Sequence, residues 1–260
     1  RGAQYPVESE DDGTEQSPDW TIEPEGTCYR CYVAVYEHHV TAAVAYGIYN
    51  YAKITKDKDF LYSQGAEILT ETARFWASRC EYVAEKDRYE ITQVTGPDEW
   101  HEPVDNNLYT NYLARWNLRY VSKLVEEMKE NRPEAYRALV EKTGISDEEI
   151  QSWKQVQEKI YLPRKEGTDL LEQFEGYFEL DDVTIEKYDE NDWPVRPEAL
   201  KTKRARETQI IKQADVVMLL HLMGEEFSPE LIKLNYSYYE KRTLHGSSLS
   251  PSIYSVMGLK

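Results

Sequence analysis

The chain has 260 residues, a formal net charge of −17 at pH 7, and 21 tyrosines beside 6 tryptophans. This charge argues against a nucleic-acid or anionic-membrane partner, because binding to phosphate-rich surfaces needs a basic face. No apolar run approaches the roughly 20 residues of a membrane-spanning helix, and three cysteines cannot build a closed disulfide framework. We therefore expect one soluble, largely helical domain from a reducing compartment.

An extended loop is predicted for residues 1–30, followed by two helices. Proline, glycine and acidic residues interrupt the first 30 positions. Apolar residues then recur at helical spacing over 37–54 and again over 58–78. Cys28 and Cys31 form a lone C-x-x-C motif, which without a second pair is typical of two ordinary reduced thiols.

A loop that carries polar motifs is expected between residues 81 and 102. It contains a strand-like run at 89–94 and then the turn-forming sequence Gly96-Pro97-Asp98. After the capping cluster 105–107, apolar and aromatic residues repeat every three or four positions as far as Met128. This pattern predicts a long helix.

Helix signals return in the second half of the chain. Ser146 with Glu149 predicts a capping box for a helix of about 15 residues, and Ser228-Pro229 predicts another helix start. The acidic, proline-broken interval 163–204 predicts a long loop, whereas 205–223 predicts a helix that carries Lys212 and Gln213. In all, six or seven helices joined by substantial loops are expected.

The segment 95–107 has the densest set of polar side chains. It places several carboxylates, among them Asp98, Glu99 and Glu102, around a tight turn beside Trp100. A carboxylic acid whose pKa is raised by apolar or like-charged neighbours can protonate a glycosidic oxygen at neutral pH. The residues by themselves favour a solvated acidic turn, and a calcium loop is disfavoured because the alternating Asp-x-Asp-x-Asp-Gly order is missing.

The segment 241–250 is unusual in this acidic chain because it combines two cations, a histidine, a glycine and three serines. Such a segment can bind an oxyanion through backbone amides, hydroxyls and a nearby lysine, especially where it opens a helix. A purely structural role, as a pair of charges at a helix C-terminus followed by a serine-rich turn, fits equally well. Lys212 and Gln213 likewise fit either a pocket or a solvent-facing helix surface.

Taken together, these segments resemble glycoside hydrolase family 65, the maltose, trehalose, kojibiose and nigerose phosphorylases. The resemblance covers nearly the whole chain and is most specific in the run TGPDEWHEPVDNNLYTN. Its sequence islands, in order, are Gly2–Pro6 with Asp12-Gly13, Glu37–His39, Thr95–Asn111, Gln173–Phe178, and Lys212–Asp215 with His245–Pro251. The resemblance implies an all-α fold, an (α/α)6 barrel of which 1–260 is a catalytic-domain portion, without the family's N-terminal β-sandwich and early barrel helices.

The resemblance also implies the site residues. Glu99 corresponds to the general acid of the Gly-Pro-Asp-Glu element. The implied phosphate-binding residues are Lys212, Gln213, His245, Ser247 and Ser248, and those that shape the sugar subsites are Trp100, His101 and Glu102. The reaction implied is a single inverting displacement, in which the acid protonates the glycosidic oxygen while phosphate attacks the anomeric carbon and yields β-glucose 1-phosphate.

The run Trp100-His101-Glu102 favours an α-1,2 or α-1,3 disaccharide, kojibiose or nigerose, as substrate. No metal or organic cofactor is expected, since the five histidines show no recognised ligand spacing and phosphate is itself a co-substrate. The resemblance implies a homodimer, and the expected reducing compartment indicates a cytoplasmic location. Two alternatives stay open, namely an inverting α-glucoside hydrolase of trehalase type and a non-catalytic carbohydrate-binding helical toroid.

Overall fold

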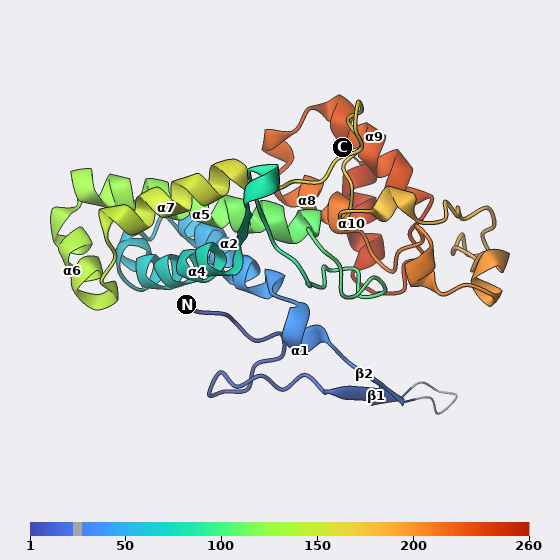
Figure 1. Ribbon diagram of the computed structural model, residues 1–260, viewed down its shortest axis with the longest axis horizontal. Coiled ribbons are helices and arrows are strands. Elements are labelled where there is room, and N and C mark those ends of the chain that lie inside the picture. Colours follow the sequence, from blue (N-terminus) through green and yellow to red (C-terminus); the bar gives the residue numbers. More distant parts are fainter. Residues whose placement is uncertain (23–27, 260) are drawn as a thin grey trace. The chain divides into compact units, whose positions relative to one another are not determined.

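The computed structural model describes residues 1–22 and 28–259, which divide into two compact units (Figure 1). The first unit comprises Arg1–Ile91 and Thr110–Tyr161, and the second comprises Thr92–Tyr109 and Leu162–Lys260. Helices dominate the first unit and are the main regular structure of the second, and the strands are only three residues long. The predicted all-α class therefore matches the architecture of the described residues.

The first unit is a group of helices packed around α4. Its helical segments are α1 (Val33–Tyr36), α2 (His39–Thr55), α3 (Lys58–Phe60), a π-helix (Leu61–Gly65), α4 (Ala66–Arg79), all but the first two residues of α5 (Leu108–Asn131), α6 (Pro133–Thr143) and α7 (Asp147–Lys159). Helix α4 contacts α2, α6 and α7. The helices predicted at 37–54, at 58–78 and after residue 107 are thus confirmed, with an unpredicted π-turn inside the second.

Two short hairpins in the first unit were not anticipated in full. Strands β1 (Trp20–Ile22) and β2 (Cys28–Arg30) pair antiparallel inside the segment predicted as loop, of which residues 23–27 lie outside the described residues. Strands β3 (Glu81–Val83) and β4 (Arg88–Glu90) pair with Tyr82 opposite Tyr89, so only the start of the strand-like run 89–94 is in a strand. Strands of three residues are too short to show a reliable alternating pattern.

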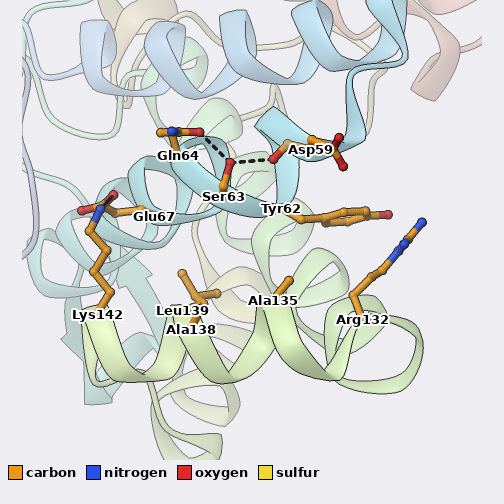
Figure 2. A pocket seen from close by; sticks show the side chains of 10 residues that line it. All are labelled: Asp59, Tyr62, Ser63, Gln64, Glu67, Arg132, Ala135, Ala138, Leu139 and Lys142. Atoms are coloured by element: carbon orange, nitrogen blue, oxygen red, sulfur yellow. Dashed lines mark hydrogen bonds and ion pairs between the residues drawn. The ribbon is translucent and has the colours of Figure 1, made fainter.

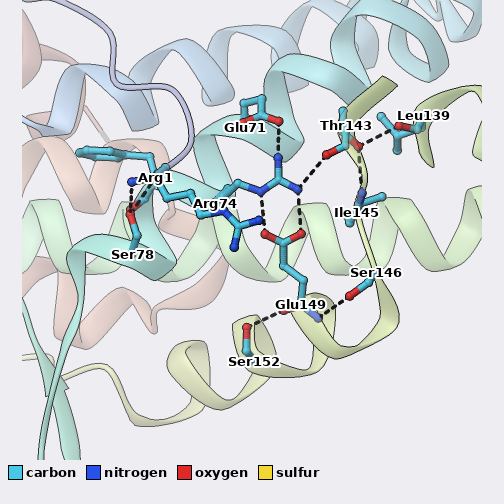
Figure 3. A network of polar contacts seen from close by, with 11 residues as sticks. Arg1, Glu71, Arg74, Ser78, Leu139, Thr143, Ile145, Ser146, Glu149 and Ser152 are labelled. Atoms are coloured by element: carbon cyan, nitrogen blue, oxygen red, sulfur yellow. Dashed lines mark hydrogen bonds and ion pairs between the residues drawn. The ribbon is translucent and has the colours of Figure 1, made fainter. Parts of the chain in front are cut away.

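A buried arginine ties three parts of the first unit together (Figure 3). Arg74 on α4 binds both carboxylate oxygens of Glu149, at 2.6 and 2.7 Å, and also binds the Glu71 carboxylate and the Thr143 carbonyl. At the start of α7, the Ser146 hydroxyl accepts the Glu149 amide at 3.2 Å as predicted. The Glu149 side chain is committed to Arg74, so only the serine half of the predicted capping box is present.

The second unit contains three α-helices among long irregular segments. Helices α8 (Asp215–Leu222), α9 (Pro229–Glu240) and α10 (Ser250–Gly258) pack against one another and are the orange to red helices of Figure 1. The predicted cap is present, since the Ser228 hydroxyl accepts the Leu231 amide at 3.2 Å. The interval 163–204 is irregular as expected, with 3-10 turns at Tyr177–Glu179 and Glu198–Lys201; two more, Ala205–Glu207 and Gly224–Glu226, follow it.

The helix predicted at 205–223 is wrong in its first half. Only Asp215–Leu222 is α-helical, and residues 208–214 form an extended segment in which Ile211 pairs with Thr243. Ile210 and Ile211 are both fully buried although they are neighbours. Two consecutive buried isoleucines satisfy a helical pattern and a doubly buried extended segment equally well, and the backbone pairing to 242–244 decides the outcome.

A small apolar cluster in the second unit supports this extended segment. Ile185, Leu200, Ile210 and Leu244 form the cluster, and Trp100 packs against it. Within the described residues, no helix combines the length and the apolar character needed to cross a bilayer.

Candidate active site

The turn that carries Glu99 is built around the buried carboxylate of Asp98, which is 1% exposed. Its Oδ1 accepts the backbone amides of Lys212 at 2.9 Å and Trp100 at 3.3 Å. Its Oδ2 meets the His101 Nδ1 at 2.6 Å and accepts the Gln173 Nε2 at 3.0 Å. One carboxylate therefore joins the 98–101 turn to two segments that are distant in sequence, and this fixes the backbone of the predicted acid.

Gly96 allows this turn to lie directly against the start of α8. A Cβ atom at this position would lie 2.2 Å from Asp215 Oδ2 and 2.4 Å from Asn107 Nδ2, so no larger residue fits without displacing them. Asp215 is buried and accepts the Asp98 amide and the Asn107 side chain, each at 2.7 Å. The Gly-Pro-Asp-Glu sequence is thus a close-packed turn rather than the solvated acidic turn that its composition favours.

Lys212 connects the acid to the candidate phosphate segment. Its Nζ donates to Glu99 Oε1 at 2.7 Å, with the Lys212 side chain 21% and the Glu99 side chain 39% exposed. Its carbonyl accepts the Gly246 amide at 3.0 Å. A Cβ on Gly246 would lie 3.1 Å from Lys212 Cγ and 3.2 Å from Trp100 Cζ2, so the aliphatic part of the lysine and the Trp100 ring both lie close to Gly246.

The predicted phosphate-binding side chains of the last segment lie at the start of α10. His245 has a left-handed backbone, and its Nδ1 is 2.8 Å from the Ser250 hydroxyl. Burial lowers the pKa of His245, so the neutral ring is favoured in this structure. Ser247 is half-buried and accepts the Leu249 amide at 3.3 Å, while Ser248 is exposed. As anticipated for an anion site, the segment leads directly into a helix.

Gln213 and Glu102 complete the candidate site. The Gln213 side chain donates to the Pro97 carbonyl and thereby braces the turn. Glu102 is half-buried, and its Oε2 lies 3.5 Å from the Thr95 hydroxyl. Burial first, and then the negative charge of Glu99, raise the pKa of Glu102.

His101 lies in the interior of the second unit and is 3% exposed. Its Nε2 is 2.9 Å from the Thr208 carbonyl, while its Nδ1 faces Asp98. Burial alone would lower the pKa of His101, but the Asp98 carboxylate outweighs it, so the pKa is raised. This geometry gives the predicted sugar contact no support, because neither ring nitrogen is left to meet a hydroxyl.

The residues that organise the site are ones for which the sequence pattern predicts no role. Each lies inside a motif island and is almost fully buried, namely Asp98, Asn107, Gln173 and Asp215. In the sequence, their importance is indicated by their position in the same motifs as the predicted acid and lysine. Burial and long-range hydrogen bonding, which distinguish a supporting residue from a ligand contact, are not visible in sequence.

The two cavities described next are not lined by the predicted site residues. A cavity of about 520 Å³ in the first unit is lined by side chains of the π-helix and α6, including Tyr62, Arg132 and Leu139 (Figure 2). A second cavity, of about 420 Å³, is lined by residues between Asp182 and Ala199 in the second unit. None of the predicted site residues lines either cavity.

Chemically, the second unit brings together a carboxyl group, an ammonium group and a serine-rich loop that precedes a helix. The Glu99 carboxyl can donate a proton to a leaving oxygen, and the lysine with the 245–248 segment can hold an oxyanion. The two predicted functions therefore meet in one place, joined by the Glu99–Lys212 ion pair.

Comparison with known proteins gives a family match over the whole chain. The family model described as the glycosyl hydrolase family 65 central catalytic domain matches residues 1–260. A kojibiose phosphorylase from Caldanaerobacter subterraneus subsp. tengcongensis is 54% identical over 260 residues, covering 100% of this chain and 34% of that protein. A kojibiose phosphorylase from Thermoanaerobacter brockii is 52% identical with the same coverage.

A solved structure gives the same result for the fold. The structure described as "Putative kojibiose phosphorylase from human microbiome" matches with a TM-score of 0.81 and 31% identity, over 99% of this chain and 33% of that one. The predicted fold class, an all-α chain that forms part of an (α/α)6 barrel, is thereby confirmed. The chain spans about a third of the length of the curated relatives it matches.

Proposed function

This chain belongs to glycoside hydrolase family 65, and on that premise we propose that it is part of an inverting disaccharide phosphorylase whose general acid is Glu99. The observation that carries the proposal is the ion pair between Glu99 and Lys212, with Lys212 hydrogen-bonded through its backbone to Gly246. An ammonium group beside the proposed acid supports this function, because phosphorolysis needs a proton donor and an anion-binding group in one site.

The proposed reaction is one displacement. Glu99 transfers its proton to the glycosidic oxygen as the bond from that oxygen to the anomeric carbon breaks. A phosphate oxygen forms the new bond to the anomeric carbon from the opposite face, which gives β-glucose 1-phosphate and a free sugar. Phosphate is the nucleophile, so the step needs no second carboxylate, metal or organic cofactor.

In this proposal the phosphate ligands are Lys212, Gln213, His245, Ser247 and Ser248. The lysine supplies charge, and the hydroxyls of Ser247 and Ser248 supply directed hydrogen bonds. Trp100 lies beside Gly246 and offers an aromatic surface for the sugar.

Kojibiose is the proposed substrate, because the two relatives named above are kojibiose phosphorylases at 54% and 52% identity. The sequence at Trp100–Glu102 leaves nigerose as the other linkage to compare. A homodimer and a cytoplasmic location stay predictions.

The test measures β-glucose 1-phosphate released by the full-length protein from kojibiose, nigerose, maltose and trehalose, with and without phosphate. We expect phosphate-dependent release from kojibiose, and a rate at least about 1,000-fold lower in Glu99→Gln, because general acid catalysis contributes up to about 10⁴-fold. Glu190→Gln, at an exposed carboxylate of the 163–204 loop, is the matched control and should keep the wild-type rate. Glucose release without phosphate would instead support the hydrolase, and full activity of Glu99→Gln would refute the assignment of the acid.

A further inference from the structure

The loop between residues 182 and 199 contains a short hairpin whose return arm carries Trp193. The Val195 amide donates to the Lys187 carbonyl at 2.8 Å, and the Asp189 amide donates to the Trp193 carbonyl at 2.9 Å. The Asp189 Oδ1 in turn accepts the Trp193 amide at 2.9 Å. Both backbone groups of Trp193 are therefore held, so its position is fixed although the surrounding loop is irregular.

Both ends of this loop are anchored to the segment that leads into His245. The Ile185 amide donates to the Lys241 carbonyl at 2.8 Å. Ile185 and Leu200, one near each end of the loop, share an apolar cluster with Leu244, the residue before His245. The cluster therefore holds the loop against the candidate phosphate segment, and both belong to the second unit.

The indole of Trp193 lies beside the imidazole of His245. The two ring centroids are 6.1 Å apart, and the ring planes are inclined at 53°. The His245 ring also meets Tyr254, edge to face, at a centroid distance of 5.0 Å. Trp100 lies close to Gly246, the next residue along the chain. Two tryptophans thus border two consecutive residues of the segment that the proposed function gives to phosphate.

Exposure by itself does not single out Trp193, because isolated apolar side chains are common on protein surfaces. Tyr188 in the same hairpin is exposed to the same fraction, 47%. Burial first, and then the charge of Glu240, raise the pKa of Tyr188, which places its hydroxyl near the end of α9. Among the described residues, Trp193 has a ring contact with His245 and Tyr188 has none. Location beside the candidate site therefore distinguishes Trp193.

An accessible indole at the edge of an anion site suits a sugar ring. A pyranose presents C–H groups on its faces and hydroxyls around its rim. An indole offers a flat apolar face and one N–H donor, so it can cover the face of a sugar while the hydroxyls meet polar groups nearby. The sugar must lie against the bound phosphate, because phosphate attacks its anomeric carbon. Trp193 therefore borders the region that the disaccharide has to occupy.

We propose that Trp193 is a sugar-binding residue of this site, and that its indole packs against a pyranose ring of the disaccharide. The inference rests on the proposed function, which places phosphate at Lys212 and 245–248. Two rings have the required chemistry, namely the glucosyl unit and the sugar that leaves. The contact holds the substrate and takes no part in proton transfer, so its loss should appear mainly in KM.

The test is the kinetics of phosphorolysis by the full-length protein, in which phosphate and the disaccharide that the wild type cleaves are varied in turn. Trp193→Ala should raise the KM for the disaccharide about tenfold and leave the KM for phosphate within about twofold of wild type. Trp193→Phe, which keeps an aromatic face, should recover most of the affinity. Tyr188→Ala is the matched control in the same hairpin and should keep both wild-type values.

The reverse reaction, from β-glucose 1-phosphate and the acceptor sugar, identifies the ring that Trp193 contacts. A raised KM for β-glucose 1-phosphate in Trp193→Ala assigns the contact to the glucosyl unit. A raised KM for the acceptor assigns it to the leaving sugar. Wild-type values for both would overturn the proposal.

Two further results would contradict a sugar contact at Trp193. A raised KM for phosphate with an unchanged KM for the disaccharide would show that Trp193 acts only through His245. Equal losses in Trp193→Ala and Tyr188→Ala would show that the hairpin, and not the indole, is what matters. Either result leaves the proposed function standing, whereas a wild-type protein without phosphate-dependent release would overturn both.

Discussion

Each unit has a buried charged residue at its centre, and the two are satisfied in opposite ways. Arg74 in the first unit is surrounded by acceptors, two of them the carboxylates of Glu71 and Glu149 (Figure 3). Asp98 in the second unit is surrounded by donors, two of them backbone amides and one the neutral side chain of Gln173. The first centre joins helices, whereas the second joins a turn, an extended segment and a loop.

The difference indicates where rigidity in each unit comes from. The helices around Arg74 satisfy their own backbone groups, so the arginine adds charge pairing to elements that are already regular. The segments around Asp98 lie outside helices and sheets, so their backbone amides need other acceptors. The Asp98 carboxylate accepts two of them, from Trp100 and Lys212. Regular structure therefore supports the first unit, whereas buried polar side chains, Asp98 among them, organise the candidate site of the second.

The largest effect is expected from Asp98→Asn. The substitution removes the charge that pairs with His101 and turns one acceptor atom into a donor that faces other donors. We expect a loss of about 3 to 4 kcal/mol in unfolding free energy, measured by urea denaturation, because breaking a buried pair leaves unsatisfied groups. Hydrogen exchange should rise in the segments 96–102 and 208–213. Unchanged exchange there would show that Asp98 does not organise the turn.

A smaller effect is expected from Arg74→Met. It leaves Glu149 and Glu71 without their cation, but these side chains keep 15% and 29% exposure and can be partly solvated. We expect a loss of about 2 kcal/mol by the same denaturation measurement. Arg137→Met, which removes an exposed cation 3.9 Å from Glu134, is the control and should cost under about 0.5 kcal/mol. A cost for Arg74→Met as large as that of Asp98→Asn would remove the contrast between the two centres.

The smallest expected effect is a pH dependence of the unfolding free energy that the pair of His101 and Asp98 contributes. The pKa of His101 is raised above its ordinary value by Asp98, against the opposing effect of burial, so its stabilisation is complete below about pH 6.5. That stabilisation declines as the pH rises through the pKa of the folded state. His101→Gln should therefore cost more unfolding free energy at pH 6 than at pH 9. The cost of Arg74→Met should be the same at both values, because the guanidinium stays charged.

The sequence could predict elements whose apolar spacing is long and uninterrupted. The helices α2 and α5 and the capped starts of α7 and α9 were expected within a few residues of where they lie. The extended segment 208–214 could not be predicted from the sequence, because two neighbouring buried isoleucines fit a helix and an extended segment equally well. Its outcome depends on the pairing of Ile211 with Thr243, which no local pattern contains.

By itself, the sequence determined the family, the helical class and the short motifs in which the candidate acid and phosphate ligands occur. Only the tertiary structure decided how those motifs meet. It placed Lys212 against Glu99 across 113 positions of sequence and put Asp98 and His101 in the interior. The physical reason is that helical spacing is a local property of the chain, whereas hydrogen bonds and ion pairs between distant segments exist only once the backbone has brought them together.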